Sequence, residues 1–233
     1  MSLQNCIIQV TGIVQGVGFR PFVYNLALQK SLTGWVRNTS HGVDIEISGE
    51  TSQIEQFTAH LKQFPPPLAQ IHNLSISFTP YNPYSKFEIY FSRDSETDFL
   101  PISPDISICK DCAKELFDPL NQRYRYPFIN CTNCGPRFTI TNHIPYDRPN
   151  TSMVNFQMCE FCEKEYHDPV NRRFHAQPIA CPNCGPKVWF EANGVTLGEK
   201  EKAIQIARQW LKDGKNISYK GIRRISFSMR YPE

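Results

Sequence analysis

Eight of the nine cysteines fall into four Cys-x-x-Cys pairs, and this spacing constrains the fold more than any other feature of the sequence. Two residues between thiolates let a tight turn present both sulfurs to one tetrahedral ion, so four sulfurs can close a structural Zn²⁺ site. The pattern Cys-x2-Cys-x18-Cys-x2-Cys occurs twice, which predicts two zinc ions per chain. The predicted ligands are Cys109, Cys112, Cys131 and Cys134, and then Cys159, Cys162, Cys181 and Cys184.

The two cysteine sets belong to an internal repeat with a constant offset of 50 residues. Between the cysteine pairs, Asp-Pro-Leu-Asn-Gln-Arg at 118–123 aligns with Asp-Pro-Val-Asn-Arg-Arg at 168–173. We therefore expect residues 105–192 to form one duplicated, zinc-stabilised module. Redox pairs or an iron–sulfur cluster are disfavoured, because the sequence lacks a thioredoxin-like context and the ferredoxin spacings. Interleaved ligation, in which one repeat lends a pair to the other, stays open.

The charge balance does not favour a nucleic-acid partner. The chain has 25 basic and 22 acidic residues, a formal net charge of +3. Each tetrathiolate zinc site carries a formal charge of about −2, so two sites offset this excess. Arg123-Tyr-Arg-Tyr126 interleaves charge with aromatic rings in the manner of a base-stacking surface. Without a basic footprint, however, we do not expect the chain to bind nucleic acid.

The sequence shows neither a signal peptide at its start nor a run of the ~20 apolar residues that a membrane helix needs. We therefore expect a cytoplasmic protein with reduced thiols and no membrane partner. Cys6 stands apart from the pairs, and we expect it to be a small core residue.

Residues 1–91 predict an α+β domain. Short alternating runs indicate strands at 5–14, 34–38, 42–48, 73–78 and 86–91. Apolar spacing indicates helices at 21–29 and between Ser48 and Pro65. This order is typical of the ferredoxin-like split βαβ fold, an antiparallel sheet with both helices on one face.

The remaining segments are less regular. Residues 92–104 are polar and contain proline, which indicates a linker. A helix is expected at 200–212 and a strand at 217–220, followed by too few residues to complete a domain.

The loop Gln15-Gly-Val-Gly-Phe-Arg20 between the first strand and helix is a candidate anion site. Free backbone N–H groups and the positive end of the helix can cradle a phosphate there. Arg20 stands at a helix N-terminus, where the helix dipole disfavours a cation, so its position indicates that an anion is expected. By itself, the loop could equally be a glycine-rich turn with a solvated arginine.

Three motifs add to this interpretation: Gly12–Arg20, Gly-Trp-Val-Arg-Asn at 34–38, and Gly-Val-Asp-Ile-Glu-Ile-Ser-Gly at 42–49. Together they resemble the acylphosphatase family over residues 5–91. The resemblance implies that Asn38 positions an attacking water, although Asn38 is also typical of a turn. It implies that the phosphoryl group is bound by Arg20 and by the loop amides of Gln15, Gly16, Val17, Gly18, Phe19 and Arg20.

The whole chain resembles the N-terminal part of the HypF family of carbamoyltransferases, which serve nickel–iron hydrogenase maturation. The resemblance implies that the first domain hydrolyses carbamoyl phosphate. Later domains would then use ATP to pass the carbamoyl group to the partner HypE, for cyanide-ligand synthesis. Residues 193–233 resemble a truncated start of the family's YrdC-like domain, and they depart from the family pattern after Gly221.

Full carbamoyl transfer is therefore not expected of this chain. ATP is not expected to bind it either, since the sequence lacks a Walker A loop. The alternative interpretation is a non-catalytic scaffold that uses the zinc repeats to bind a protein or RNA.

Overall fold

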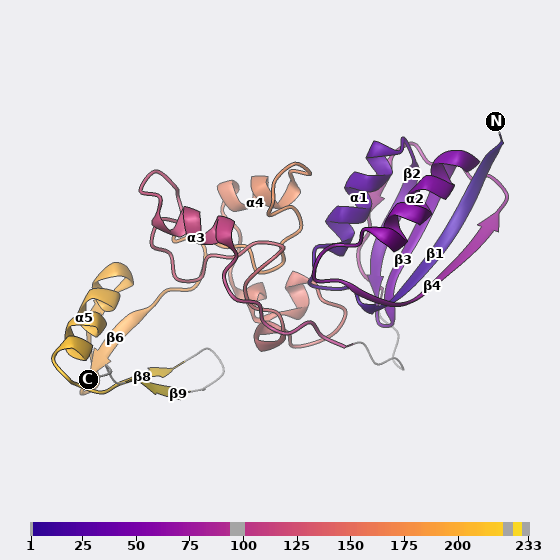
Figure 1. Cartoon of the computed structure of the whole chain (residues 1–233). Coiled ribbons are helices and arrows are strands. Elements are labelled where there is room, and N and C mark those ends of the chain that lie inside the picture. Colours follow the sequence, from indigo (N-terminus) through magenta and orange to yellow (C-terminus); the bar gives the residue numbers. More distant parts are fainter. Residues whose placement is uncertain (1, 94–100, 221–225, 230–233) are drawn as a thin grey trace.

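The computed structural model describes residues 2–93, 101–220 and 226–229. Three parts follow one another along an elongated molecule (Figure 1). A sheet covered by two helices comes first, a cysteine-rich part with little regular structure lies in the middle, and a small unit of one helix and two hairpins comes last.

The first part is built on a five-stranded sheet of order β4-β1-β3-β2-β5. Its strands are β1 (Leu3–Ile13), β2 (Thr33–Thr39), β3 (Gly42–Glu50), β4 (Gln70–Thr79) and β5 (Phe87–Ile89). The expected ferredoxin-like α+β fold is confirmed, and β1 to β4 pair antiparallel as expected, whereas the short β5 pairs in parallel with β2. The reason is that β5 does not pair with β4. It lies at the other edge of the sheet beside β2, and β2 and β5 run in the same direction.

Helices α1 (Phe19–Gln29) and α2 (Thr51–Gln63) cover the same face of this sheet (Figure 1). Alternate residues of β1 point into the core beneath them, and Cys6, Ile8 and Val10 are fully buried. Burying each large apolar side chain of this kind stabilises the fold by about 1.5–3 kcal/mol. Cys6 is thus confirmed as a core residue, and burial raises the pKa of its thiol to about 11.

The middle part repeats one arrangement twice. Helices α3 (Lys110–Phe117) and α4 (Glu160–His167) each begin directly after a cysteine. Three short 3-10 helices lie between the repeats: η1 (Phe138–Ile140), η2 (Arg148–Asn150) and η3 (Ser152–Asn155). One small apolar cluster packs around the cysteines of each repeat. Cores of this size rarely hold a fold alone, which is consistent with stabilisation by metal.

The last part contains β6 (Trp189–Ala192), β7 (Val195–Glu199), α5 (Lys200–Lys212), β8 (Ile217–Lys220) and β9 (Ser226–Met229). The helix at 200–212 and the strand at 217–220 are confirmed. The β6–β7 hairpin spans the expected boundary at 192, and Phe190 packs on Trp210 of α5 with ring centroids 5.0 Å apart. Much of the expected linker lies at 94–100, outside the described residues. The residues at which the sequence begins to differ from the family pattern, 221–225, also lie outside them.

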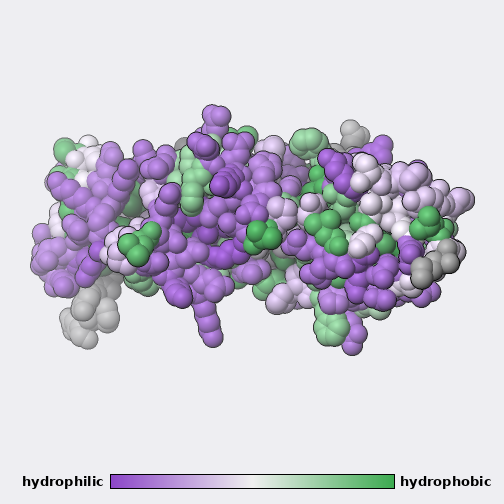
Figure 2. Space-filling view, turned by 90° about the horizontal axis from the view of Figure 1, so that it is seen from above, coloured by the Kyte–Doolittle hydropathy of each residue, from purple (hydrophilic) through white to green (hydrophobic). Residues whose placement is uncertain are grey.

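The surface in Figure 2 is mostly hydrophilic, with hydrophobic residues in scattered small patches. Within the described ranges, the structure contains no helix that combines the length and the apolar character needed to cross a membrane.

Candidate functional site

The loop between β1 and α1 is shaped to receive an anion. Gly16 and Gly18 have φ angles of 73° and 76°, a region that glycine adopts at little cost. The backbone N–H groups of residues 16–20 donate no hydrogen bond to any other described residue. They converge at the start of α1, where the helix dipole adds positive potential. Such a set of free amides is typical of a phosphate-binding nest.

Arg20 lies in the first turn of α1 and is buried. Its Nη2 atom is 2.7 Å from Oδ1 of Asp147 and 3.3 Å from the main-chain oxygen of Tyr146. Both contacts use the same nitrogen. In the described part of the chain, Nε and Nη1 therefore remain available to a ligand.

Asn38 lies near the end of β2 and is 1% exposed. It is not the turn residue that its sequence context also allowed, because the strand continues to Thr39. Its Nδ2 donates to the main-chain oxygen of Tyr146 at 3.2 Å. Its Oδ1 is buried and has no hydrogen-bond partner among the described residues. An unpaired buried acceptor costs about 1–3 kcal/mol, so this oxygen is suited to a donor such as water.

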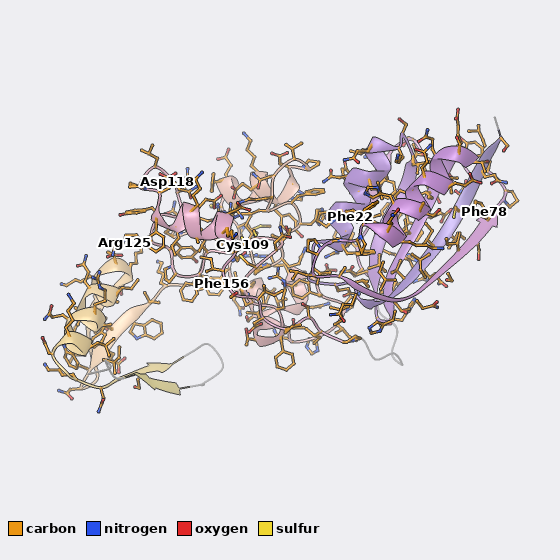
Figure 3. All side chains as sticks on the ribbon, in the orientation of Figure 1. Phe22, Phe78, Cys109, Asp118, Arg125 and Phe156 are labelled. Carbon is orange, nitrogen blue, oxygen red and sulfur yellow. The ribbon has the colours of Figure 1, made fainter. Side chains whose placement is uncertain are left out.

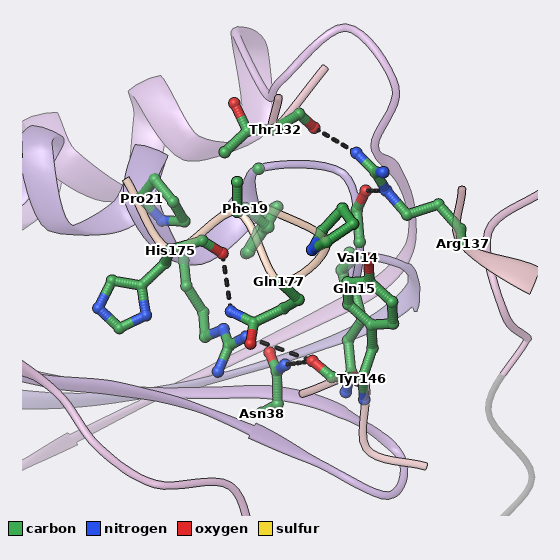
Figure 4. Close-up of a pocket in the computed structure, with 15 residues that line it drawn as sticks. Val14, Gln15, Phe19, Pro21, Asn38, Thr132, Arg137, Tyr146, His175 and Gln177 are labelled. Carbon is green, nitrogen blue, oxygen red and sulfur yellow. Dashed lines mark hydrogen bonds between the residues drawn. The ribbon is translucent and has the colours of Figure 1, made fainter. Parts of the chain in front are cut away.

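Arg20, Asn38 and the loop line one small cavity of about 20 Å³. Figure 4 shows that the other wall comes from the cysteine-rich part. The residues that the sequence predicts for phosphate and water are thus brought together. The wall that the sequence did not predict is formed by Thr132, Arg137, Tyr146, His175, Ala176, Gln177 and Pro178.

Arg137 connects the loop to the cysteines of the first repeat. Its Nε donates to the main-chain oxygen of Gly16. Its other nitrogens donate to the main-chain oxygens of Thr132 at 2.8 Å and Cys131 at 3.1 Å, and to those of Cys134 and Pro136. The shape of the loop between β1 and α1 is therefore linked to the turn that carries Cys131 and Cys134.

His175 lines the same cavity. Burial, reinforced by the nearby charges of Arg20 and His167, lowers the pKa of its imidazole to about 3. The ring is therefore neutral near pH 7. A second cation would compete with Arg20 for the same anion, and a neutral ring does not.

Each repeat brings its own four cysteines together, with all four sulfurs within 4.8 Å of one another. Neighbouring sulfurs in the first cluster lie 3.7 and 3.8 Å apart, and those in the second 3.6 and 3.7 Å apart. A tetrahedral ion about 2.3 Å from each sulfur places the sulfurs about 3.8 Å apart, whereas a disulfide needs about 2.05 Å. The geometry fits zinc, and the four sulfurs of each cluster all come from one repeat.

Arginines from each repeat reach the cysteines of the other. Both terminal nitrogens of Arg172 are 3.2 Å from Sγ of Cys112, and Nη2 of Arg123 is 3.4 Å from Sγ of Cys162. Arg123 is only 1% exposed. Within Arg123-Tyr-Arg-Tyr126, Arg123 and Tyr126 are thus buried in the packing, whereas Tyr124 and Arg125 are exposed.

Glu115 joins this network. Burial alone would raise the pKa of its carboxyl, but hydrogen bonds and ion pairs with Arg172 and Arg173 outweigh burial and lower the pKa to about 2. Figure 3 labels Cys109 at the start of α3, the helix that carries Glu115. The carboxylate thus holds arginines of the second repeat beside the cysteine cluster of the first.

Comparison with known proteins agrees with this arrangement. The acylphosphatase family profile matches residues 6–89, and the HypF finger profile matches residues 108–141 and 158–191. An acylphosphatase of Methanospirillum hungatei is 37% identical over 81 residues, which cover 34% of this chain and 89% of that protein.

Longer matches cover nearly the whole chain. The carbamoyltransferase HypF of Synechocystis sp. is 50% identical over 221 residues, or 94% of this chain and 29% of that protein. A crystal structure of full-length HypF in its phosphate- and nucleotide-bound form superimposes with a TM-score of 0.86 at 47% identity, covering 95% of this chain and 29% of that one. The chain thus spans less than a third of these relatives. Because it carries both the acylphosphatase domain and the HypF finger repeats, the chain belongs to the HypF family of carbamoyltransferases.

Proposed function

We propose that this chain hydrolyses an acyl phosphate and that its substrate is carbamoyl phosphate. The observation that carries the proposal is the buried, unpartnered Oδ1 of Asn38, which lines the same cavity as Arg20 and the free loop amides. Water-orienting and phosphate-holding groups therefore share one site. The names of the relatives, which are carbamoyltransferases, and the phosphate-bound form of one of them support this substrate class.

In the proposed reaction, the amides of residues 16–20 and the Nε and Nη1 atoms of Arg20 hold the phosphoryl oxygens. A water molecule donates a hydrogen bond to Oδ1 of Asn38 and directs its oxygen at phosphorus. The new oxygen–phosphorus bond forms as the bond from phosphorus to the acyl oxygen breaks. Carbamate leaves with the electron pair, and the water proton passes to phosphate. A neutral amide suits this position, since a carboxylate would repel the substrate dianion.

The size of the cavity favours a small acyl group. About 20 Å³ suits one or two waters or a few substrate atoms, not a bulky acyl chain. We propose that two zinc ions per chain have a structural role, holding the wall that encloses this cavity. We also propose that the third unit begins near Trp189 and that the protein is cytoplasmic. In the full-length family, carbamate would then enter an ATP-dependent transfer to HypE, in domains beyond this chain.

The test is phosphate release from carbamoyl phosphate by the purified chain. We expect Arg20→Ala and Asn38→Asp to lower the rate by roughly 100-fold or more, the effect of losing one preorganised group. Arg208→Ala and Asn73→Ala, at exposed positions of α5 and β4, are the matched controls and should keep the wild-type rate. An Arg20→Ala protein that hydrolyses at the wild-type rate would overturn the proposal.

A further inference from the structure

The segment Pro145–Asp147 of the cysteine-rich part contacts both side chains on which the proposed hydrolysis depends. The main-chain oxygen of Tyr146 accepts hydrogen bonds from Arg20 at 3.3 Å and from Asn38 at 3.2 Å. Figure 4 shows this oxygen beside the Asn38 amide, at the edge of the cavity. Because the oxygen can only accept, it fixes which end of the amide faces it. The Oδ1 end is thereby left for a donor.

Asp147 holds the other catalytic side chain. Its Oδ1 is 2.7 Å from Nη2 of Arg20, and the two side chains are 19% and 9% exposed. Its Oδ2 accepts a hydrogen bond from the hydroxyl of Ser92. Both carboxylate oxygens are thus engaged. Among the described residues, Asp147 and Tyr146 both contact Nη2 of Arg20, which leaves Nε and Nη1 for an anion.

The segment itself is held firmly. The amide of Tyr146 donates to Oε1 of Gln15 at 2.8 Å, which connects it to the phosphate loop. Arg148 donates from its backbone amide to Oε1 of Gln177 at 2.8 Å, and from its guanidinium to the main-chain oxygen of Ile179 at 2.9 Å. The segment is therefore a fixed support between the loop and the second repeat.

We propose that Asp147 is a positioning residue for the hydrolysis and acts through Arg20, an inference that rests on the proposed function. The carboxylate would repel a phosphate dianion, so its role is not to touch the substrate. It orients the guanidinium group, while the adjacent Tyr146 carbonyl orients the amide of Asn38. The hydrolytic site is therefore composite. One part of the chain supplies the groups that meet the substrate, and the zinc-supported part supplies the groups that aim them.

The same ion pair has a rival interpretation that predicts the opposite effect. If Asp147 competes with phosphate for Arg20, removing its charge should tighten phosphate binding. If Asp147 positions Arg20, removing its charge should weaken phosphate binding and slow hydrolysis. The sign of the change therefore separates the two interpretations.

The experiment compares Asp147→Asn, Asp147→Glu and the exposed β6 control Glu191→Gln in the full chain. Calorimetry measures the Kd for inorganic phosphate, and carbamoyl phosphate hydrolysis gives kcat and KM. We expect Asp147→Asn to raise the Kd and lower kcat/KM, each by roughly 10-fold or more, the effect of losing a charge-assisted hydrogen bond. Asp147→Glu should recover part of both losses, and Glu191→Gln should match the wild type. Tighter or unchanged phosphate binding by Asp147→Asn would overturn the proposal.

A separate signal distinguishes failure of this inference from failure of the proposed function. If the wild-type chain neither binds phosphate nor hydrolyses carbamoyl phosphate, the proposed function fails. The positioning role is then decided by ¹⁵N NMR of the Arg20 guanidinium, identified by its loss in Arg20→Ala. Separate, slowly exchanging Nη signals are expected in the wild type and averaged signals in Asp147→Asn. Identical signals in the two proteins would overturn the positioning role.

Discussion

The guanidinium group of Arg123 lies 3.4 Å from the sulfur of Cys162, although the two residues belong to different repeats. In the second repeat the equivalent residue, Arg173, makes the matching main-chain contact, whereas its neighbour Arg172 lies beside the sulfur of Cys112. Nε of Arg123 donates to the main-chain oxygen of Ala180 at 2.8 Å, and Nε of Arg173 donates to that of Asn130 at 3.0 Å. Each repeat thus supports the region that holds the other repeat's cysteines. The two copies therefore pack together through reciprocal contacts.

Arg123→Ala should weaken zinc binding at the Cys159 cluster, although Arg123 belongs to the other repeat. The change removes a buried cation from beside a thiolate and from its ion pair with Glu165. Breaking such a buried pair costs about 3 kcal/mol, so we also expect a lower urea midpoint. Zinc transfer to a chromogenic chelator should become faster for about one ion per chain. Exposed Arg208→Ala is the control.

A double variant shows where the Arg123 effect acts. Cys159→Ser alone should leave mainly the first zinc ion. Adding Arg123→Ala to it should then change the release of that remaining ion little. Equal acceleration at the first site would mean that Arg123 affects the whole module and not the neighbouring sulfur.

Cys109→Ser should lower the zinc content from two ions per chain to about one. The reason is that its sulfur belongs only to the first cluster, whose four members all come from one repeat. Metal analysis of the purified variant gives the stoichiometry. Loss of both ions at once would show that the first site is needed for the second to form.

Removing zinc should weaken phosphate binding, although no zinc ligand lines the cavity. The link is Arg137, which donates to the main-chain oxygens of Cys131 and Cys134 and also to that of Gly16. When the turn holding the zinc ligands loosens, the loop loses this support. Calorimetry before and after chelation should show the Kd for phosphate rising by roughly 10-fold or more. Arg137→Ala at full zinc occupancy should shift it in the same direction.

Adding zinc back to the chelated protein provides the control for this experiment. Re-addition should restore the affinity of the wild type but not that of Arg137→Ala. Unchanged phosphate affinity in the zinc-free chain would show that the loop keeps its shape without the module.

Local sequence patterns predicted most of the strands and helices. The alternation of Cys6, Ile8 and Val10 predicted a strand with one buried face, because neighbouring residues of a strand point to opposite sides. The direction of β5 beside β2 was missed, since a three-residue strand carries no signal of its partner. Resemblance placed Arg20 and Asn38 in one site, and the structure brings both to the same cavity.

The second wall of the site could not be read from the sequence. Tyr146 and Arg20 are 126 residues apart, and Tyr146 contributes its main-chain oxygen, which every residue type has. The repeat itself could be recognised in the sequence. Which arginine meets which cysteine depends on how the two copies pack, and the offset of 50 residues does not contain that information.

His175 should make the stability of the folded chain depend on pH. The pKa of an unperturbed imidazole is about 6.5, whereas burial, reinforced by Arg20 and His167, lowers that of folded His175 to about 3. Between these values the unfolded chain binds a proton that the folded chain does not. The free energy of unfolding therefore falls as pH drops below about 6.5, by up to about 1.4 kcal/mol per pH unit.

Urea unfolding at about pH 7 and about pH 5 tests this in the wild type, His175→Asn and the exposed control His143→Asn. Asparagine tolerates the φ of 53° at position 175. Glu115, whose pKa is about 2 in the fold and 4.5 when unperturbed, loses its stabilising contribution mainly as pH falls below 4.5, which lies outside this interval. Acid weakening of zinc binding affects all three proteins alike. The wild type and His143→Asn should lose about 1–2 kcal/mol more than His175→Asn. Equal losses would mean that the imidazole takes up its proton as readily in the folded chain as in the unfolded one.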